Sequence, residues 1–226
     1  MGATEELNLV QTAQLIADVP EIIELDINPL LADDQGVIAL DARIGLAPAA
    51  PGTERFAIRP YPREWEERID VAGKPVLVRP IRPEDEPAFK TFISRVSPSD
   101  IHFQFFYAVR ELPHSQLARF TQIDYDREMA FVAVDDGEIL GEVRAVADPD
   151  NTRAEFAILV RSDRQGRGLG SALLSQIIRY CRARGTGELF GEVLTANRRM
   201  LALAEALGFT SRRLPDGETV RVELKL

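Results

Sequence analysis

The chain has 226 residues, 45% hydrophobic and 28% charged, which is typical of a globular protein with one good-sized domain. No apolar run approaches the roughly 18 residues of a membrane span, and the acidic N-terminal segment does not resemble a signal peptide. The net charge of −9 argues against a nucleic-acid partner, because such binders present a basic face. One cysteine excludes a disulfide framework and a multi-cysteine zinc site. We therefore expect a cytoplasmic protein without membrane, nucleic-acid or metal partners.

Acidic residues are concentrated at the start of the chain. Residues 1–46 contain nine acidic residues and one basic residue. A short amphipathic helix is expected over "LNLVQTAQLIADVP", followed by two strands, "IIELDINPLLAD" and "GVIALDARI", that flank a turn signal at Gly36. One helix and one hairpin are too small to bury a core alone. Residues 47–75 begin with a stretch rich in Pro, Gly and Ala, and we assign them to a linker.

Residues 76–226 contain a readable order of strands and helices. Asp136-Gly137 is a hairpin signal between two apolar runs, and Gly208 is placed to end a late helix. The predicted strands are "VLVRPI", "MAFVAV", "ILGEVRAVAD", "RAEFAILV", "GELFGEVL", "FTSRRL" and "ETVRVELKL". The predicted helices cover "RPEDEPAFKTFISRV", "SQLARFTQI", "SALLSQIIRYCRARG" and "NRRMLALAEALGF". This pattern predicts a mixed α/β domain with an antiparallel meander in its middle.

The stretch "RSDRQGRGLGSALL" places three glycines between a strand and a helix, an arrangement that binds phosphate. A P-loop is rejected because no lysine follows the last glycine. A dinucleotide fingerprint fits poorly, because Glu188 opens its strand and antiparallel strands precede the loop. The segment from Gln165 to Gly170 instead matches the pattern [QR]-x-x-G-x-[GA].

This pattern resembles the pyrophosphate loop of the GNAT N-acetyltransferase superfamily. "VRPIRPEDEPAF" is similar to the family's first strand and helix, "AEFAILV" to its fourth strand, and "LALAEALGF" to a later helix, all in the family's order. The resemblance implies a GNAT acyl-CoA N-acyltransferase fold over residues 76–226. That fold is a mixed, largely antiparallel sheet flanked by helices, here preceded by a small N-terminal helix-hairpin remnant.

The resemblance also implies that acetyl-CoA, or another acyl-CoA, lies between the fourth and fifth strands of the fold. Its pantetheine arm would pair with main chain near Leu159 and Val160. Asn197 has two readings that remain open, a helix N-cap and a contact to the cofactor arm. The pyrophosphate would lie on the N–H groups of the loop, namely Gln165, Gly166, Arg167, Gly168, Leu169, Gly170 and Ser171.

Glu155 is the candidate general base. It shares a strand face with Ala157 and Leu159, and such neighbours are expected to desolvate a carboxylate partly and raise its pKa. From the residues alone, a solvent-facing strand glutamate is the favoured interpretation. In the resembled family, a glutamate at this point of the fourth strand is the base in protein-acetylating members, which favours the catalytic role.

Other reactive residues receive no catalytic role. Many members of the resembled family protonate the leaving thiolate with a tyrosine, and that position is Ala204 here, so this acid is absent. Cys181 lies on an apolar helix stripe and is expected to be an inert core residue. His102 and His114 lie early in the domain and are expected at the surface.

The N-terminal segment has a resemblance of its own. "IIELDINPLLAD" and "GVIALDARI" are similar to the end of an ATP-grasp domain of ADP-forming acyl-CoA synthetases. Asn28 and Asp41 occupy the positions that hold Mg²⁺ in that family, and paired oxygen ligands suit this ion. The nucleotide-cradling half is absent from residues 1–46, so we expect no ATP binding.

The combination resembles the bacterial protein lysine acetyltransferases, to whose C-terminal part the chain would correspond. The leading hypothesis is therefore a protein lysine N-acetyltransferase that uses acetyl-CoA and a glutamate base, with an acyl-CoA synthetase as partner. Two alternatives are a small-molecule amine N-acetyltransferase and a non-catalytic acyl-CoA-sensing module.

Overall fold

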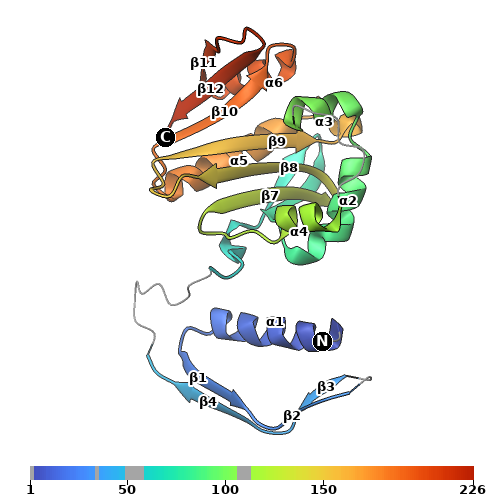
Figure 1. Cartoon of the computed structure of the whole chain (residues 1–226), viewed down its shortest axis with the longest axis vertical. Helices are drawn as coiled ribbons and strands as arrows, with labels where there is room; N and C mark the ends of the chain where they lie inside the picture. Colours follow the sequence, from blue (N-terminus) through green and yellow to red (C-terminus); the bar gives the residue numbers. More distant parts are fainter. Residues whose placement is uncertain (1–2, 34–35, 49–58, 106–112) are drawn as a thin grey trace. The chain divides into compact units, whose positions relative to one another are not determined.

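The computed structural model describes residues 3–33, 36–48, 59–105 and 113–226. The chain divides into two compact units, Met1–Pro60 and Tyr61–Leu226 (Figure 1). Among the described residues, no helix combines the length and the apolarity needed to cross a bilayer.

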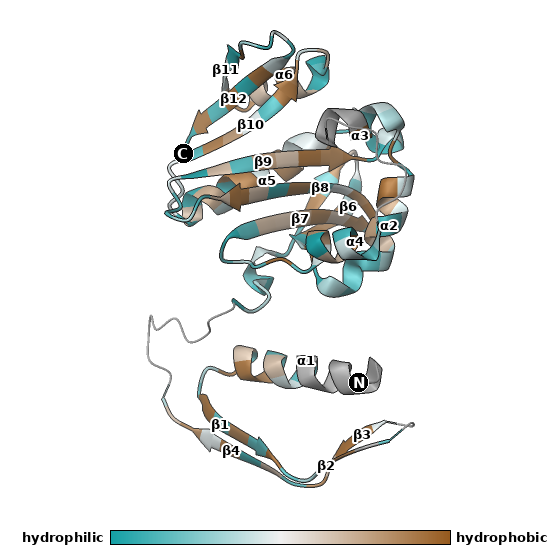
Figure 2. Ribbon diagram, in the orientation of Figure 1, coloured by the Kyte–Doolittle hydropathy of each residue, from teal (hydrophilic) through white to brown (hydrophobic). Residues whose placement is uncertain are grey.

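The first unit consists of one helix and a broken hairpin. Helix α1 (Ala3–Asp18) precedes two antiparallel strand pairs: β1 (Ile22–Ile27) with β4 (Ala42–Leu46), and β2 (Leu30–Ala32) with β3 (Val37–Ala39). Many large apolar side chains of these strands are exposed. The ribbon of these strands is brown, the colour of hydrophobic residues, over several segments in Figure 2. The predicted helix and hairpin are therefore present, and among the residues of this unit whose burial is described, Ile22 is the one buried apolar side chain.

The second unit is built on an eight-stranded sheet. The strand order is β11-β12-β10-β9-β8-β7-β6-β5, and every neighbouring pair is antiparallel except β9 and β10. The strands are β5 (Glu67–Val71), β6 (Lys74–Pro80), β7 (Glu128–Asp135), β8 (Glu138–Ala147), β9 (Arg153–Val160), β10 (Glu188–Leu194), β11 (Thr210–Arg213) and β12 (Thr219–Lys225). This is the mixed, largely antiparallel sheet that the sequence predicts.

Helices cover both faces of this sheet. Helix α5 (Leu169–Ala183) packs on one face, where Phe131 and Leu173 are fully buried. On the opposite face, Phe89 and Ile101 join a second apolar cluster built from α2 (Glu86–Ser94), α3 (Pro98–Phe105) and α4 (His114–Thr121). The central strands run as brown segments between these two layers (Figure 2). Helix α6 (Arg198–Ala206) follows β10, and short 3₁₀ turns cover Arg63–Trp65 (η1), Pro83–Asp85 (η2) and Ser162–Arg164 (η3).

The second unit begins at Tyr61 rather than at the predicted boundary, Val76. Residues 61–75, which the sequence analysis assigned to a linker, supply η1 and the edge strand β5. The Trp65 ring packs against Phe131 and Tyr180, with ring centroids 6.2 and 5.2 Å apart. The segment therefore contributes to the core.

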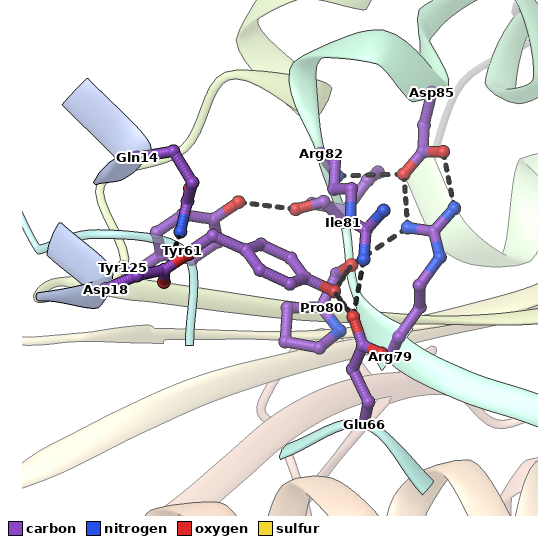
Figure 3. A network of polar contacts seen from close by, with 10 residues as sticks. All are labelled: Gln14, Asp18, Tyr61, Glu66, Arg79, Pro80, Ile81, Arg82, Asp85 and Tyr125. Carbon is purple, nitrogen blue, oxygen red and sulfur yellow. Dashed lines mark hydrogen bonds and ion pairs between the residues drawn. The ribbon is translucent and has the colours of Figure 1, made fainter. Parts of the chain in front are cut away.

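A polar network fixes this segment to β6 and η2 (Figure 3). The Tyr61 hydroxyl donates to Glu66 Oε1 at 2.7 Å, and the Arg82 guanidinium lies over the Tyr61 ring. Arg79 donates two hydrogen bonds to the buried Asp85, at 2.7 and 2.6 Å. Burial and the hydrogen bond to Glu66 raise the pKa of Tyr61 to about 12, so this hydroxyl remains a donor at neutral pH.

We expect Trp65→Ala to destabilise the second unit by about 2 kcal/mol, because a partly buried aromatic side chain is lost from the core. Arg68→Ala on the neighbouring strand is the matched control, since Arg68 is exposed and its loss should be nearly neutral. Thermal and urea unfolding of both variants measure the effect. Equal stability of the two variants would show that residues 61–75 are a linker after all.

Candidate active site

The site is built where β9 and β10 separate. These parallel neighbours pair at only three positions, Arg153 with Glu188, Ala154 with Leu189, and Glu155 with Phe190. Beyond Glu155 the two strands diverge, as Figure 1 shows, while β9 remains paired with β8 up to Val160. The backbone edge of β9 that follows Glu155 therefore faces a gap in the sheet, where an extended ligand can pair with it.

A cavity of about 1050 Å³ occupies this gap. Its walls come from β9, the glycine loop, the start of α5, β10, α6 and Asp100 of α3. Of the residues predicted to hold the cofactor, those whose atoms line the cavity are Leu159, Val160, Gln165, Gly166, Gly168, Gly170, Ser171 and Asn197. The structure thus brings most of the predicted binding residues together around one cavity.

Two glycines give the loop its shape. Gly166 and Gly168 have φ values of 75° and 86°, a left-handed conformation that other residues adopt only with strain. A Cβ at either position would meet nothing within 4 Å, so the space above the loop is open. Gly168 is the N-cap of α5, and the first N–H groups of the helix lack partners within the helix. The cradle therefore suits the diphosphate of an acyl-CoA.

Two of the predicted loop residues, Arg167 and Leu169, do not line the large cavity. Arg167 and Leu169 line a separate cavity of about 70 Å³, together with Lys74 and Arg164. Leu169 is only 2% exposed and belongs to the core. Any contact of Leu169 with a ligand in the large cavity would therefore come from its backbone N–H group.

The acidic residue next to the loop is already neutralised. Asp163 in η3 accepts two hydrogen bonds from Arg161, at 2.9 and 2.8 Å. These hydrogen bonds hold the pKa of the Asp163 carboxyl below its usual range. Arg161 also donates to Glu138 at 2.9 Å, so the end of β9 is anchored before the loop begins.

Two carboxylates face the gap from its opposite sides. Glu155 is at the last paired position of β9 and lines the cavity. Its side chain is exposed, which corrects the expectation of partial desolvation, because β10 diverges at this point and leaves it open to solvent. Glu192, two residues after the partner of Glu155 on β10, is also exposed and lines the cavity. Sequence reasoning missed Glu192, since only the strand register places it here.

A buried ion network supports the same face of the sheet. Arg144 is 9% exposed and donates to Glu142 at 2.6 Å, to Glu128, and to the Phe120 carbonyl at 2.8 Å. Burial lowers the pKa of this guanidinium, but the two carboxylates outweigh it and raise the pKa, so the charge is retained. Arg144 pairs with Ala157 in the register, two positions from Glu155 on the same face. The network thus connects α4 to strand β8, next to the part of β9 that carries the candidate base.

Other predicted residues have structural roles. The Asn197 side chain accepts a hydrogen bond from Met200 N at 3.1 Å and caps α6, while the residue also lines the cavity, so both readings remain compatible. Ala204 is fully buried. Cys181 is 2% exposed, and burial raises the pKa of its thiol to about 12, which keeps it protonated. His114 pairs with Glu86 at 2.6 Å away from the cavity, and the side chain of His102 lies outside the described residues.

Asp100 and Arg199 also line the cavity, and sequence reasoning missed both. The signal for Asp100 was the sequence Ser97-Pro-Ser-Asp100, which has the spacing of a capping box with proline at the first helical position. Ser97 Oγ donates to Asp100 Oδ2 at 2.8 Å at the start of α3. No comparable local signal marked Arg199 among the arginines of the chain.

In the first unit, the two residues at the expected Mg²⁺ positions lie close together. Asn28 and Asp41 are adjacent through the Asn28 N to Asp41 O hydrogen bond of 3.2 Å, and the Asp41 carboxylate lies 3.8 Å from Arg43. Within the described ranges, no three His, Cys, Asp or Glu side chains gather closely enough to hold an ion.

Comparison with known proteins identifies two families. Residues 98–209 match the acetyltransferase (GNAT) family, and residues 4–46 match an ATP-grasp domain family. Acetyltransferase PA5475 of Pseudomonas aeruginosa is 37% identical over 159 residues, which span 69% of this chain and 85% of the relative. Acetyltransferase Pat of Mycolicibacterium smegmatis is 26% identical over 231 residues, 90% of this chain and 69% of the relative.

Solved structures give the same fold. The GNAT domain of S. lividans PAT matches with a TM-score of 0.70 and 32% identity over 74% of this chain and all of that domain. The yncA protein of Salmonella typhimurium, solved with its cofactor acetyl-CoA, has a TM-score of 0.58 and 19% identity, covering 67% of this chain and 94% of its own. The predicted fold class and enzyme class are confirmed. The chain belongs to the GNAT family of acetyltransferases.

Proposed function

We propose that this protein transfers the acetyl group of acetyl-CoA to a lysine side chain of a partner protein, with an acyl-CoA synthetase as the candidate partner. The observation that carries the proposal is the position of Glu155, at the point where β9 and β10 separate and inside the cavity above the glycine loop. The similarity to Pat and PAT, and the ATP-grasp match at residues 4–46, support a protein substrate.

Acetyl-CoA, when bound, supplies the thioester carbonyl that the amine attacks. The loop from Gln165 to Ser171 holds the diphosphate through backbone N–H groups, and the free edge of β9 near Leu159 and Val160 aligns the pantetheine arm. Backbone N–H groups of β9 polarise the carbonyl. These groups fix the acyl donor at the end of the cavity where Glu155 lies.

Glu155 prepares the acceptor. A lysine side chain has a reference pKa of about 10.4, so it arrives protonated and cannot attack. Glu155 accepts the proton from the ammonium, directly or through one water molecule, and the neutral amine forms the new C–N bond. Glu192 adds a second negative charge from the opposite side of the gap, which favours a cationic acceptor. Ala204 supplies no proton donor, so solvent protonates the departing thiolate.

Glu155→Gln tests the base. We expect the turnover number to fall about 100-fold or more, because the substitution keeps the shape of the side chain and removes its proton affinity. Calorimetric binding of acetyl-CoA should be unchanged. Glu205→Gln is the control, since Glu205 is exposed on α6 outside the cavity lining. Turnover by Glu155→Gln equal to that of the control at about pH 8 would remove Glu155 from the mechanism.

Mass spectrometry of a candidate acyl-CoA synthetase, incubated with this protein and acetyl-CoA, tests the substrate class. Acetylation at one or a few lysines supports the proposal. Rapid acetylation of a polyamine or an aminoglycoside, with none on proteins, identifies a small-molecule enzyme instead. Binding of acetyl-CoA without transfer to any amine identifies a sensing module.

Gly168→Ala tests the cradle. The φ of 86° disfavours any residue with a Cβ, and we expect the loop to relax and the Kd for acetyl-CoA to rise about tenfold. Gly170→Ala is the matched comparison, because a Cβ there meets its nearest atom at an ordinary 3.5 Å and φ is not positive. A larger effect at Gly170 than at Gly168, measured by calorimetry, would contradict this account of the loop.

A further inference from the structure

A chain of two hydrogen bonds connects residues from opposite walls of the cavity. Gln165 Nε2 donates to Asp100 Oδ2 at 3.0 Å, and Arg199 Nη1 donates to Gln165 Oε1 at 2.8 Å. Asp100 lies in α3, which packs against β9, while Arg199 lies in α6, which follows β10. All three residues line the cavity. One glutamine of the diphosphate loop thus joins a negative group on one side of the gap to a positive group on the other.

Asp100 is a carboxylate held by neutral donors. Its Oδ2 accepts hydrogen bonds from Ser97 Oγ at 2.8 Å, from Ser162 Oγ at 2.6 Å and from Gln165 at 3.0 Å. In the part of the chain that the structure describes, no basic side chain pairs with it. Among the described residues, its negative charge is therefore not paired with a positive charge, beside the loop that receives an anionic ligand.

Arg199 is a positively charged group that is likewise held by a neutral partner. Its guanidinium is exposed, and the partner that the structure gives it is the neutral amide oxygen of Gln165. Across the described ranges, no carboxylate pairs with it. A guanidinium in this state has donors to spare and is well suited to a phosphate oxygen.

We propose that Arg199 binds a phosphate group of the coenzyme and that Asp100 weakens binding of the same ligand from the opposite wall of the cavity. The proposal rests on the proposed function, in which the cavity takes acetyl-CoA. Arg199 exchanges the Gln165 amide oxygen for a phosphate oxygen, which is a stronger, charge-assisted acceptor. Gln165 keeps its bond to Asp100, and the loop N–H groups remain free for the ligand. Arg199 and Asp100 therefore act on coenzyme affinity with opposite signs.

Calorimetric titration with coenzyme A, which requires no acyl acceptor, tests the proposal. We expect Arg199→Gln to raise the Kd about fivefold and Asp100→Asn to lower it by about the same factor. Arg199→Lys should retain most of the affinity, because the charge is kept. Both effects should shrink at high salt, since the groups are screened by solvent ions. Arg182→Gln is the control, an equal loss of charge at an exposed site outside the cavity lining.

Titration with 3′-dephospho-coenzyme A identifies the phosphate. An effect of Arg199→Gln that persists with this ligand assigns the diphosphate, and one that disappears assigns the 3′-phosphate; either supports the proposal. Thermal unfolding shows whether each variant remains folded at the titration temperature.

Two results would overturn the inference, and they differ in what else they affect. If the wild-type chain binds coenzyme A but Arg199→Gln and Asp100→Asn both match the control, the hydrogen-bond chain is structural only and the proposed function stands. If Arg199→Lys loses as much affinity as Arg199→Gln, the inference also fails, and the proposed function again stands. If the wild-type chain does not bind coenzyme A, the proposed function fails together with this inference.

Discussion

The separation of β9 from β10 is the constraint on which the rest of the site depends. After three paired positions, the parallel neighbours diverge, and the sheet gives up backbone hydrogen bonds that strands normally satisfy. Gly191 helps to set this geometry, because a Cβ there would lie 2.9 Å from the Phe156 ring. The ring in turn packs against Phe209, with centroids 5.3 Å apart. Phe156 and Gly191 both line the cavity, so the absence of a side chain at Gly191 leaves room there for the aromatic ring.

The shape of the loop and the strand that carries Glu155 were predictable because their signals are local, whereas the role of Glu155 as a base is inferred from the family resemblance. Gly166 and Gly168 adopt a backbone conformation that only glycine takes readily, so their spacing reports the shape of the loop directly. Glu155 was found on a strand whose alternation is clear in the sequence. From the residues alone, a solvent-facing side chain was the favoured interpretation, and Glu155 is exposed. The partial desolvation expected from its neighbours in the chain was wrong, because exposure depends on where β10 diverges.

The remaining parts of the site depend on contacts distant in sequence. Strand β5 has the charged, half-exposed pattern of an edge strand, so its sequence resembles that of a linker. Only the packing of the preceding Trp65 against the core shows that this segment belongs to the domain. Asp100 and Gln165 are 65 residues apart, and their bond follows from the packing of α3 against β9. Glu192 is exposed and polar, like many surface residues, and only the register with Glu155 distinguishes it. The sequence thus predicts the conformation of single segments, whereas the tertiary fold determines which residues from distant segments meet at the site.

The buried position of Cys181 has a consequence for redox chemistry. The proposed reaction releases coenzyme A, a free thiol, beside the protein at every turnover. The chain has one cysteine, and it is 2% exposed with its pKa raised to about 12, so little thiolate forms on the protein itself. Cys181 is thereby a poor partner for exchange with coenzyme A disulfide, should an oxidant convert the released thiol to that form. A thiol-reactive dye added to the reaction would accordingly count released coenzyme, with almost no background from the protein.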